Sequence, residues 1–279
     1  MQDLWISKSG LRRKGTSVLE LRKLFEDGIT VLSIYEPIQA CSSGDHANDI
    51  KEKMRQLDFD VIGIKSTEDG PVEGYIRASD LQEGLCGDFK LDFLVADLIS
   101  DSTPLIDLLT VLRDKERIFI LAGNTVHGII TRADLQKPPI RILIFGLITL
   151  LDMHLSRLVR KFYLGESWRD KLSQGRIEKA EQMMKAREDR NEKLDIIDCL
   201  QFCDKRTLIL AKKEILNIFG FSSEDEGKDT LKLIESLRDK LAHSQDIVTG
   251  SIWKDISTIV ERMEQLIQQS EKSIESSVN

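Results

Sequence analysis

Two stretches of this sequence match each other and decide the fold of its first half: VEGYIRASDL (Val72–Leu81) and VHGIITRADL (Val126–Leu135). Gly, Ile, Asp and Leu recur in step at an offset of 54 residues, beginning with Gly74 and Gly128. Self-similarity at a fixed offset is the sequence signature of a repeated structural unit. The first half of the chain is therefore predicted to contain two copies of one fold.

The segments that precede the two copies also match in kind. Before the second copy come a helix start at Thr103-Pro104, the β-rich run RIFIL (117–121) and a turn at Gly123-Asn124. Before the first copy come HANDIKEKMRQL, the strand VIGIK and a turn at 68–71. Each unit is predicted to run helix, strand, turn, strand, and then a closing helix opened by the Asp-Leu pair.

This order of elements, ending in Gly-x-Ile-Thr-x-x-Asp, resembles the CBS domain, and two copies in tandem resemble a Bateman module. GIITRAD matches the pattern in full, whereas GYIRASD has Arg77 in place of the threonine. The resemblance implies that Thr131 and Asp134 hold an adenine nucleotide (AMP, ADP or ATP), and that Asp80, with Arg77 for a phosphate, serves a second, pseudo-symmetric cleft. Helix N-termini suit phosphate, and aspartate accepts ribose hydroxyls.

Because only the second copy keeps the threonine, we expect it to bind the nucleotide more tightly than the first. The alternative is that Thr131, Asp134, Asp80 and Arg77 merely cap helices, and that the tandem is a dimerisation scaffold.

After Lys137-Pro138-Pro139 glycine becomes sparse and apolar residues recur at helical spacing. The predicted helices span 140–163, 177–190, 194–202, 205–219, 228–242 and 252–274. Short loops favour an up-and-down bundle. The predicted fold class is thus an α+β tandem pair followed by an all-α bundle. Its domains are an N-terminal extension (1–16), repeats at 17–82 and 83–137, and a helical domain at 140–275.

The stretch LRDKLAHS (237–244) places Arg238 within an apolar stripe that runs from Leu231 to Leu241. A buried guanidinium needs hydrogen-bond acceptors, so a charge in such a stripe has either a partner or a task. His243 follows five residues later, about 140° around an ideal helix from Arg238. The two side chains can still converge if the helix ends at Ala242, or if a second protomer completes the site.

An arginine, a polar residue, three more residues and a histidine resemble the R-x4-H signature of the HEPN superfamily, whose all-helical, dimeric domains include many metal-independent ribonucleases. The resemblance implies that His243 acts as general base or acid, that Arg238 binds the scissile phosphate, and that Asp239 orients one of them. The RNA is then cut by its own 2′-hydroxyl. The alternative is an inactive domain, with Arg238 in a salt bridge to Asp152 or Asp198.

The bulk composition bounds the remaining possibilities. A net charge of −7 over 279 residues argues against a protein that coats nucleic acid by bulk attraction. The N-terminus shows no signal-peptide pattern, and the run ILIFGLITLL (142–151) is about half a membrane span, so we expect a buried helix there. Cysteines 41, 86, 199 and 203 lack zinc-ligand spacing, which predicts reduced thiols, no metal site and a cytoplasmic protein.

Two functions remain open. The first is a metal-independent endoribonuclease regulated by an adenine nucleotide, with RNA as substrate, at least a homodimer, and neither membrane nor DNA as partner. The second is a non-catalytic nucleotide sensor whose helical domain mediates dimerisation and docks on a protein partner. Only Gln-Lys-Pro-Pro separates the second repeat from the first bundle helix, so little slack is expected between sensor and effector.

Overall fold

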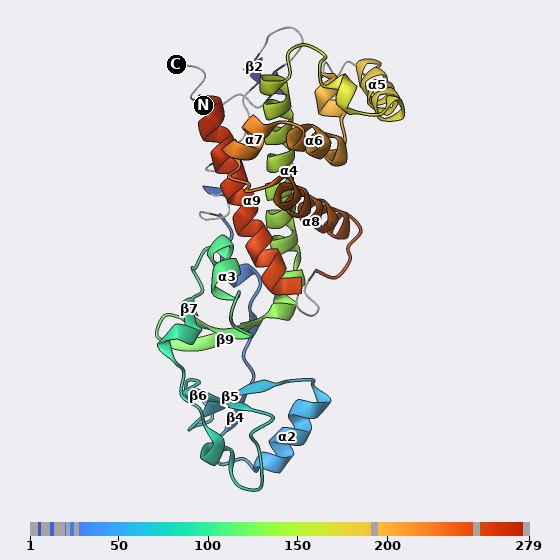
Figure 1. Ribbon diagram of the computed structural model, residues 1–279. Coiled ribbons are helices and arrows are strands. Elements are labelled where there is room, and N and C mark those ends of the chain that lie inside the picture. The colour runs from blue at the N-terminus through green and yellow to red at the C-terminus, as the bar shows by residue number, and fades with distance from the viewer. Residues whose placement is uncertain are drawn as a thin grey trace. The chain divides into compact units, whose positions relative to one another are not determined.

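The computed structural model describes residues 5–6, 12–13, 20, 23–24, 28–190, 195–247 and 252–275. The chain divides into two compact units (Figure 1). The repeat unit is Phe25–Pro139, and the helical unit is Ile140–Asn279 together with Met1–Leu24. Near the N-terminus, β1 (Trp5–Ile6) and β2 (Arg12–Arg13) pair antiparallel.

The first repeat is built on a three-stranded sheet in the order β4 (Ala40–Ser42), β5 (Val61–Lys65), β6 (Gly74–Arg77). β4 and β5 are parallel and are joined by α2 (Ala47–Gln56), whereas β5 and β6 form an antiparallel hairpin. Ile62 and Ile64 of VIGIK pack with one face of α2, where Met54 is fully buried. The predicted helix, strand, turn and strand are therefore present.

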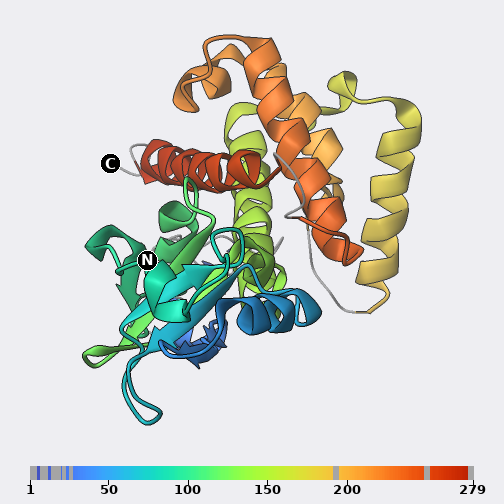
Figure 2. The ribbon, with the colours of Figure 1, turned by 90° about the horizontal axis from the view of Figure 1, so that it is seen from below.

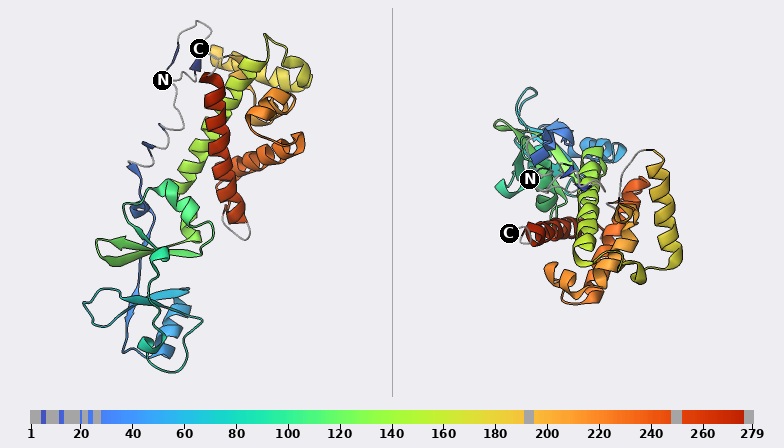
Figure 3. Two further views of the ribbon diagram at one scale, coloured as in Figure 1. Left: turned by 60° about the vertical axis from the view of Figure 1, so that its left-hand side comes forward. Right: turned by 90° about the horizontal axis from the view of Figure 1, so that it is seen from above.

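The second repeat has a four-stranded sheet in the order β3 (Glu36–Pro37), β9 (Thr125–Thr131), β8 (Arg117–Ala122), β7 (Leu98–Ser100). α3 (Leu105–Val111) connects β7 to β8, which are parallel. The short strand β3 lies within the predicted first repeat (17–82) yet pairs antiparallel with β9 of the second. Figure 3 shows the two sheets, in blue and in green. This crossed pairing links the repeats.

Among its described residues the repeat unit also contains four short 3-10 helices: η1 (Val31–Ser33), η2 (Cys86–Phe89), η3 (Val95–Asp97) and η4 (Arg132–Gln136).

The glycines of the two matching stretches occupy equivalent places, in β6 and in β9. A Cβ atom at Gly74 would lie 2.5 Å from the carbonyl oxygen of Leu91, and one at Gly128 would lie 2.1 Å from the Tyr35 ring. Both glycines are thus required because another segment passes close to the strand. The glycine that recurs in the sequence therefore marks, in each repeat, the place where another segment passes close to the strand.

The closing helices of the two units differ from the prediction of α-helices. After β6 the chain makes only a turn at 78–80, and after β9 it makes the short helix η4. Lys137, which follows η4, is extended (φ −62°, ψ 147°). A residue before proline is disfavoured in the α region, and Pro138 has no N–H to continue a helical ladder. Pro138 therefore separates η4 from the next helix.

The helical unit is built from helices of very different length. They are α4 (Pro138–Phe162), η5 (Arg169–Lys171), α5 (Gln174–Glu188), η6 (Ile196–Cys199), α6 (Phe202–Leu210), α7 (Lys213–Ile218), α8 (Glu224–Ala242) and α9 (Ile252–Glu275). Figure 2 shows α5 at the periphery of this group. From residue 140 on, the described residues include no strand.

The two long helices α4 and α9 run in the same direction. The Nδ1 atom of His154 lies 3.2 Å from the Ser270 hydroxyl, and Nζ of Lys161, further along α4, donates to the carbonyl of Ser273, further along α9. This parallel pair departs from the up-and-down bundle predicted from short loops. The reason is that loop length constrains only neighbouring helices, whereas α4 and α9 are first and last in the unit.

The predicted helix 205–219 is two helices, and the predicted helix 194–202 is, over its described residues, the 3-10 helix η6 and an extended link. In an unbroken helix the N–H of Lys212 would donate to the carbonyl of Leu208. That carbonyl instead accepts the Tyr163 hydroxyl at 2.8 Å, and Lys212 donates to Ile209. A tertiary contact with the end of α4 thus breaks the helix.

Of the described helices, only α4 is long and apolar enough to cross a membrane, and 61% of its most apolar window is buried inside the protein. That burial agrees with the predicted buried helix. His154 lies in its interior with no exposed surface, and burial first, then the charge of Arg157, lowers the pKa of this histidine to about 4. We assign it a packing role.

Candidate functional site

The aspartate of the second repeat is already occupied by its own chain. Asp134 is 8% exposed, and its Oδ2 accepts both the backbone N–H of Thr131 at 2.7 Å and the Thr131 hydroxyl at 3.1 Å. Its Oδ1 lies 2.9 Å from Nζ of Lys137, which also donates to the carboxylate of Glu36. One lone pair of the four on this carboxylate has no assigned partner in these contacts. Thr131 and Asp134 thus form a helix cap.

The aspartate of the first repeat is open. Asp80 is exposed, and the hydroxyl of the adjacent Ser79 donates to its Oδ1 at 2.7 Å. Arg77, at the end of β6, is also exposed and donates to the Tyr75 hydroxyl at 3.4 Å. That hydrogen bond, followed by the charges of Asp80 and Glu116, raises the pKa of Arg77. A cation and a carboxylate thus stand near each other with lone pairs and N–H groups to spare.

A cavity of the repeat unit lies at the other end of β9 from Thr131. It measures about 690 Å³ and is lined by residues 38–40, 65, 69–72 and 125–127, which include none of the four predicted nucleotide-binding residues. Its volume is in the range of small-molecule sites. His127 lies in its wall, with Nε2 2.7 Å from the Thr125 hydroxyl. A lone histidine in a strand has no spacing pattern, so the sequence does not point to it.

On α8, Arg238 lies at the edge of the apolar face and not within it. The Leu231–Leu241 stripe is buried as predicted, but the Arg238 side chain is 34% exposed. Its Nε and Nη2 donate to Oδ1 of Asp239 at 3.1 and 2.8 Å, and its guanidinium carbon lies 5.8 Å from the centre of the Phe202 ring. Asp239 therefore orients Arg238, and three guanidinium N–H bonds remain for a ligand.

His243 is exposed and is the C-cap of α8, with its backbone N–H donating to the carbonyl of Asp239. α8 ends at Ala242, as the sequence required for convergence, but the N–H of His243 still donates four residues back as in a helix, so its angular separation from Arg238 is kept. The cavity that Arg238 lines does not include His243. Within one protomer the two predicted catalytic residues share a helix but no cavity.

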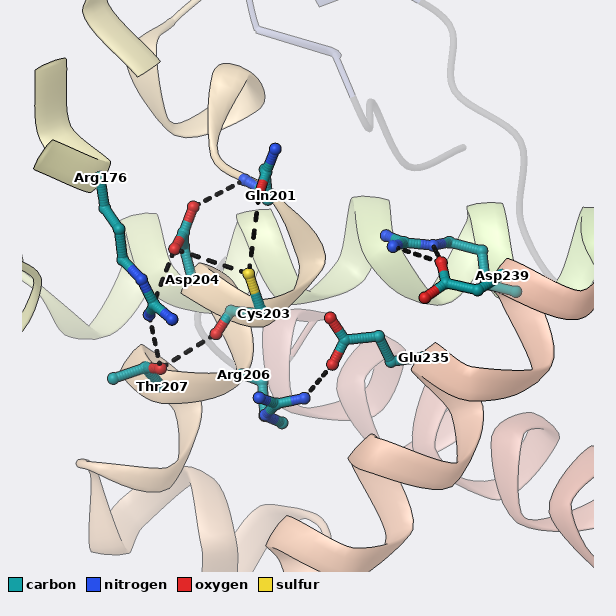
Figure 4. A network of polar contacts seen from close by, with 9 residues as sticks. Arg176, Gln201, Cys203, Asp204, Arg206, Thr207, Glu235 and Asp239 are labelled. Atoms are coloured by element: carbon teal, nitrogen blue, oxygen red, sulfur yellow. Dashed lines mark hydrogen bonds and ion pairs between the residues drawn. The ribbon is translucent and has the colours of Figure 1, made fainter. Parts of the chain in front are cut away.

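A polar network holds the segment beneath Arg238 in place (Figure 4). Asp204, which is buried, accepts the backbone N–H of Gln201 at 3.0 Å and forms an ion pair with Arg176 at 3.3 Å. Arg206 pairs with Glu235 of α8. These contacts fix the start of α6, where Phe202 lies, against the helix that carries Arg238.

A cavity of about 330 Å³ opens beside Arg238, and we call it the Arg238 pocket. It is lined by Phe145, Ile148, Thr149, Asp152, Met183, Asp198, Cys199, Leu200, Gln201, Phe202 and Arg238. A smaller cavity of about 180 Å³ shares Thr149, Asp152 and Asp198 with it. Apolar walls and a few polar groups are the usual composition of a small-molecule site.

The two aspartates that the sequence offered as partners of Arg238 are engaged elsewhere. Asp152 Oδ2 lies 2.7 Å from Nζ of Lys205, which is only 2% exposed, and Asp198 Oδ1 lies 2.5 Å from Nη2 of Arg160. Among the described residues, the buried Oδ1 of Asp152 has no hydrogen-bond partner. The carboxylate that pairs with Lys205 thus retains an unused acceptor beside the Arg238 pocket.

The described residues contain no group of three or more His, Cys, Asp or Glu side chains placed to hold a metal ion. The four cysteines are free thiols.

No protein-family model matches this sequence, and no curated protein matches it. Part of the chain is similar to solved CBS-domain structures. One is the CBS domains of a transcriptional regulator from Streptococcus pneumoniae, at 18% identity, covering 39% of this chain and 98% of that chain, with a TM-score of 0.34.

Two further structures contain a nucleotide. CBSX2 in complex with AMP is 16% identical, covers 41% of this chain and 98% of that chain, and has a TM-score of 0.36. The CBS domain of the bacterial CNNM/CorC family Mg²⁺ transporter in complex with ATP is 16% identical, covers 42% of this chain and 88% of that chain, and has a TM-score of 0.33.

Proposed function

We propose that this protein is a metal-independent endoribonuclease of the HEPN type, regulated by an adenine nucleotide that binds its tandem CBS-like repeats. The observation that carries the proposal is on α8. An arginine oriented by its neighbour Asp239 stands at the mouth of a cavity, and an exposed histidine ends the same helix. This pairing supplies a phosphate-binding cation and a proton-transfer group, which is what cleavage by the 2′-hydroxyl requires.

In the proposed reaction the 2′-oxygen of the RNA attacks the adjacent phosphorus and the 5′-oxygen leaves. His243 either takes the proton of the 2′-hydroxyl while water protonates the departing 5′-oxygen, or protonates that oxygen while water takes the hydroxyl proton. Arg238 binds the two non-bridging oxygens through its free N–H bonds and stabilises their extra charge. The products are a 2′,3′-cyclic phosphate and a 5′-hydroxyl. DNA, which lacks the attacking hydroxyl, is not a substrate.

A second copy of the chain completes the site in this proposal. Arg238 and His243 diverge on α8 and do not share a cavity within one protomer. Two α8 helices facing each other in a homodimer bring the arginine of one protomer to the histidine of its partner. Because the two side chains diverge on one helix, cleavage then requires a homodimer.

We propose that each repeat has one site for the regulatory nucleotide and that the two sites have unequal roles. Asp80 accepts the ribose hydroxyls and Arg77 binds a phosphate, since both are exposed and retain hydrogen-bonding capacity. Thr131 and Asp134 form the corresponding site of the second repeat, but a ligand there competes with Lys137. Free thiols in all four cysteines fit a reducing cytoplasm.

The test incubates purified protein with total RNA in the presence of EDTA, with and without AMP, ADP or ATP. Arg238→Ala and His243→Ala are each expected to lower cleavage by about a hundredfold or more, since general acid–base catalysis contributes about 10²–10⁴. Lys232→Ala, which removes a charge from an exposed position of the same helix, is the matched control. Cleavage that disappears with EDTA, or that survives His243→Ala, contradicts the proposal.

A second candidate function has its own observation. Ile142 and Phe145 on α4 and Met183 on α5 are exposed apolar side chains, at 61%, 45% and 38%. Exposed apolar residues on neighbouring elements are typical of a protein-binding surface. In that case the helical unit is a non-catalytic docking domain controlled by the nucleotide. Absence of RNA cleavage by a folded, nucleotide-binding protein distinguishes this candidate from the ribonuclease.

A further inference from the structure

We infer that the Arg238 pocket binds the base of a nucleotide flanking the scissile phosphate, and that it selects guanine. The inference rests on the proposed function in one respect, that Arg238 holds the phosphate. The pocket assigns the ribonuclease a sequence preference that neither Arg238 nor His243 can supply.

The pocket has the size and walls that a base needs. Its volume of about 330 Å³ is at the low end for small-molecule sites and accommodates one base with part of its sugar. Phe145, Ile148 and Phe202 provide apolar surface, and aromatic rings are favourable partners for the faces of bases. Arg238 lies over Phe202 at the edge of the same cavity, so a base in the pocket leaves its phosphate within reach of the guanidinium.

Three polar side chains of the pocket offer acceptors: Thr149, Asp152 and Asp198. Asp152 forms an ion pair with the buried Lys205 through Oδ2, and its Oδ1 has no hydrogen-bond partner among the described residues. The Thr149 hydroxyl donates to the carbonyl of Phe145 at 2.9 Å, so its remaining capacity is to accept. Asp198 adds a second carboxylate. A ligand that satisfies these groups must present N–H donors.

Guanine presents more of these donors than the other bases. Its N1–H and N2–H groups are adjacent, so a single carboxylate accepts from both, and bidentate pairs are the more specific ones. Adenine and cytosine offer one amino group each, and uracil one N–H. The arrangement of acceptors around Asp152 therefore predicts guanine first and uracil last.

The first experiment maps cleavage sites on RNA of random sequence by sequencing the ends. The expected result is enrichment of guanine by about tenfold or more at one fixed position flanking the cut. Thr149→Phe fills the pocket without removing a charge, and what cleavage remains is then spread over all four bases. Ile142→Phe is the matched control, because Ile142 is exposed on the same helix and does not line the pocket.

The second experiment measures binding without cleavage. Calorimetry compares guanosine 3′-monophosphate with adenosine 3′-monophosphate on the full chain and on Thr149→Phe, which leaves the repeat unit intact. The expected preference for the guanosine nucleotide is about tenfold to a hundredfold, as for one charged hydrogen-bonded pair, and it disappears in Thr149→Phe. Asp152→Asn, which loses an ionised acceptor, is expected to remove the preference as well.

The outcomes separate this inference from the proposed function. RNA cleavage with no base preference, together with equal binding of the two nucleotides, overturns the base pocket and leaves the ribonuclease standing. Selective binding of guanosine 3′-monophosphate that Thr149→Phe abolishes, without any cleavage of RNA, supports the pocket and overturns the ribonuclease. A preference that Ile142→Phe removes as readily as Thr149→Phe contradicts the assignment to this cavity.

Discussion

The two repeats differ in how far each satisfies its own aspartate. In the second, Asp134 is buried, accepts the N–H and the hydroxyl of Thr131, and pairs with Lys137. In the first, Asp80 is exposed and accepts from the neighbouring Ser79. The threonine that completes the motif in the second repeat is thus one of the groups that occupies its aspartate.

This contrast shows that a sequence can match the motif because it caps a helix, and not only because it binds a ligand. A Thr-x-x-Asp sequence satisfies a capping box by itself, whatever else it binds. The fuller match predicted the tighter site, but the geometry favours the first repeat, where Arg77 replaces the threonine and the carboxylate is open. The distinction between a closed and an open repeat can be tested by substitutions in each repeat.

The largest effect is expected at the matching glycines. A methyl group at Gly74 meets the backbone carbonyl of Leu91 at 2.5 Å, which cannot move without shifting a paired strand, whereas at Gly128 it meets mainly the Tyr35 ring, which can rotate. We expect Gly74→Ala to cost about 2–3 kcal/mol and Gly128→Ala about 1 kcal/mol. Urea unfolding followed by hydrogen exchange of each hairpin measures both.

Gly44→Ala is the control for the glycine pair, because its nearest contact would be the Ser42 hydroxyl at 3.9 Å. Equal losses at Gly74 and Gly128 would show that the ring of Tyr35 is held as firmly as a strand.

Replacing the aspartate by alanine should lower nucleotide affinity strongly in the first repeat and only slightly in the second. Asp80→Ala removes an exposed, charged acceptor worth about 1.5–3 kcal/mol, which is about ten- to a hundredfold in affinity. Asp134→Ala is expected to weaken binding less than about threefold. Calorimetry with AMP, ADP and ATP decides between them, with the exposed Asp92→Ala as control. A larger loss in Asp134→Ala would reverse the assignment of open and closed repeats.

Stability should show the opposite order. Asp134→Ala removes a capping box and a partly exposed ion pair to Lys137, so we expect a loss of about 1–2 kcal/mol. Asp80→Ala should lie within about 0.5 kcal/mol of the parent, as exposed substitutions usually do. Thermal or urea unfolding compares the two directly. If both variants are equally stable, the hydrogen bonds around Asp134 do not hold the second repeat together.

The smallest effect concerns alkaline pH and the first repeat alone. Burial, and then the adjacent Cys86 thiol, raise the pKa of Cys41 from 9.0 to about 12. The unfolded chain therefore loses this proton first. The contribution of the protonated Cys41 thiol to the free energy of unfolding is complete below pH 9 and is lost as pH rises towards 12. We expect a loss of about 1 kcal/mol by pH 10.

Unfolding of the first repeat measured from pH 8 to 10.5 checks the expected loss. Ile99 occupies the position of Cys41 in the second sheet, which serves as the internal control. Cys41→Ala should flatten the pH profile of the first repeat, and an unchanged slope in that variant would place the titrating group elsewhere.

The sequence alone was sufficient for features carried by neighbouring residues. The repeat, the strands of both hairpins and the buried stripe of α8 all depend on local periodicity and backbone geometry. The sequence also singled out Arg238, because a charge in an apolar stripe is visible from spacing. Its position at the edge of that stripe was not visible.

The tertiary structure alone decided what each polar group meets. The Tyr163 hydroxyl takes the carbonyl that an unbroken helix would have used, and β3 crosses to the sheet of the other repeat. Asp134 is occupied by Lys137. The Arg238 pocket draws its walls from α4, α5, η6, α6 and α8, and its lining residues span about ninety positions of the chain. Hydrogen bonds within a turn are encoded by adjacent residues, whereas the spare acceptors that make a site depend on contacts between distant segments, which no local pattern specifies.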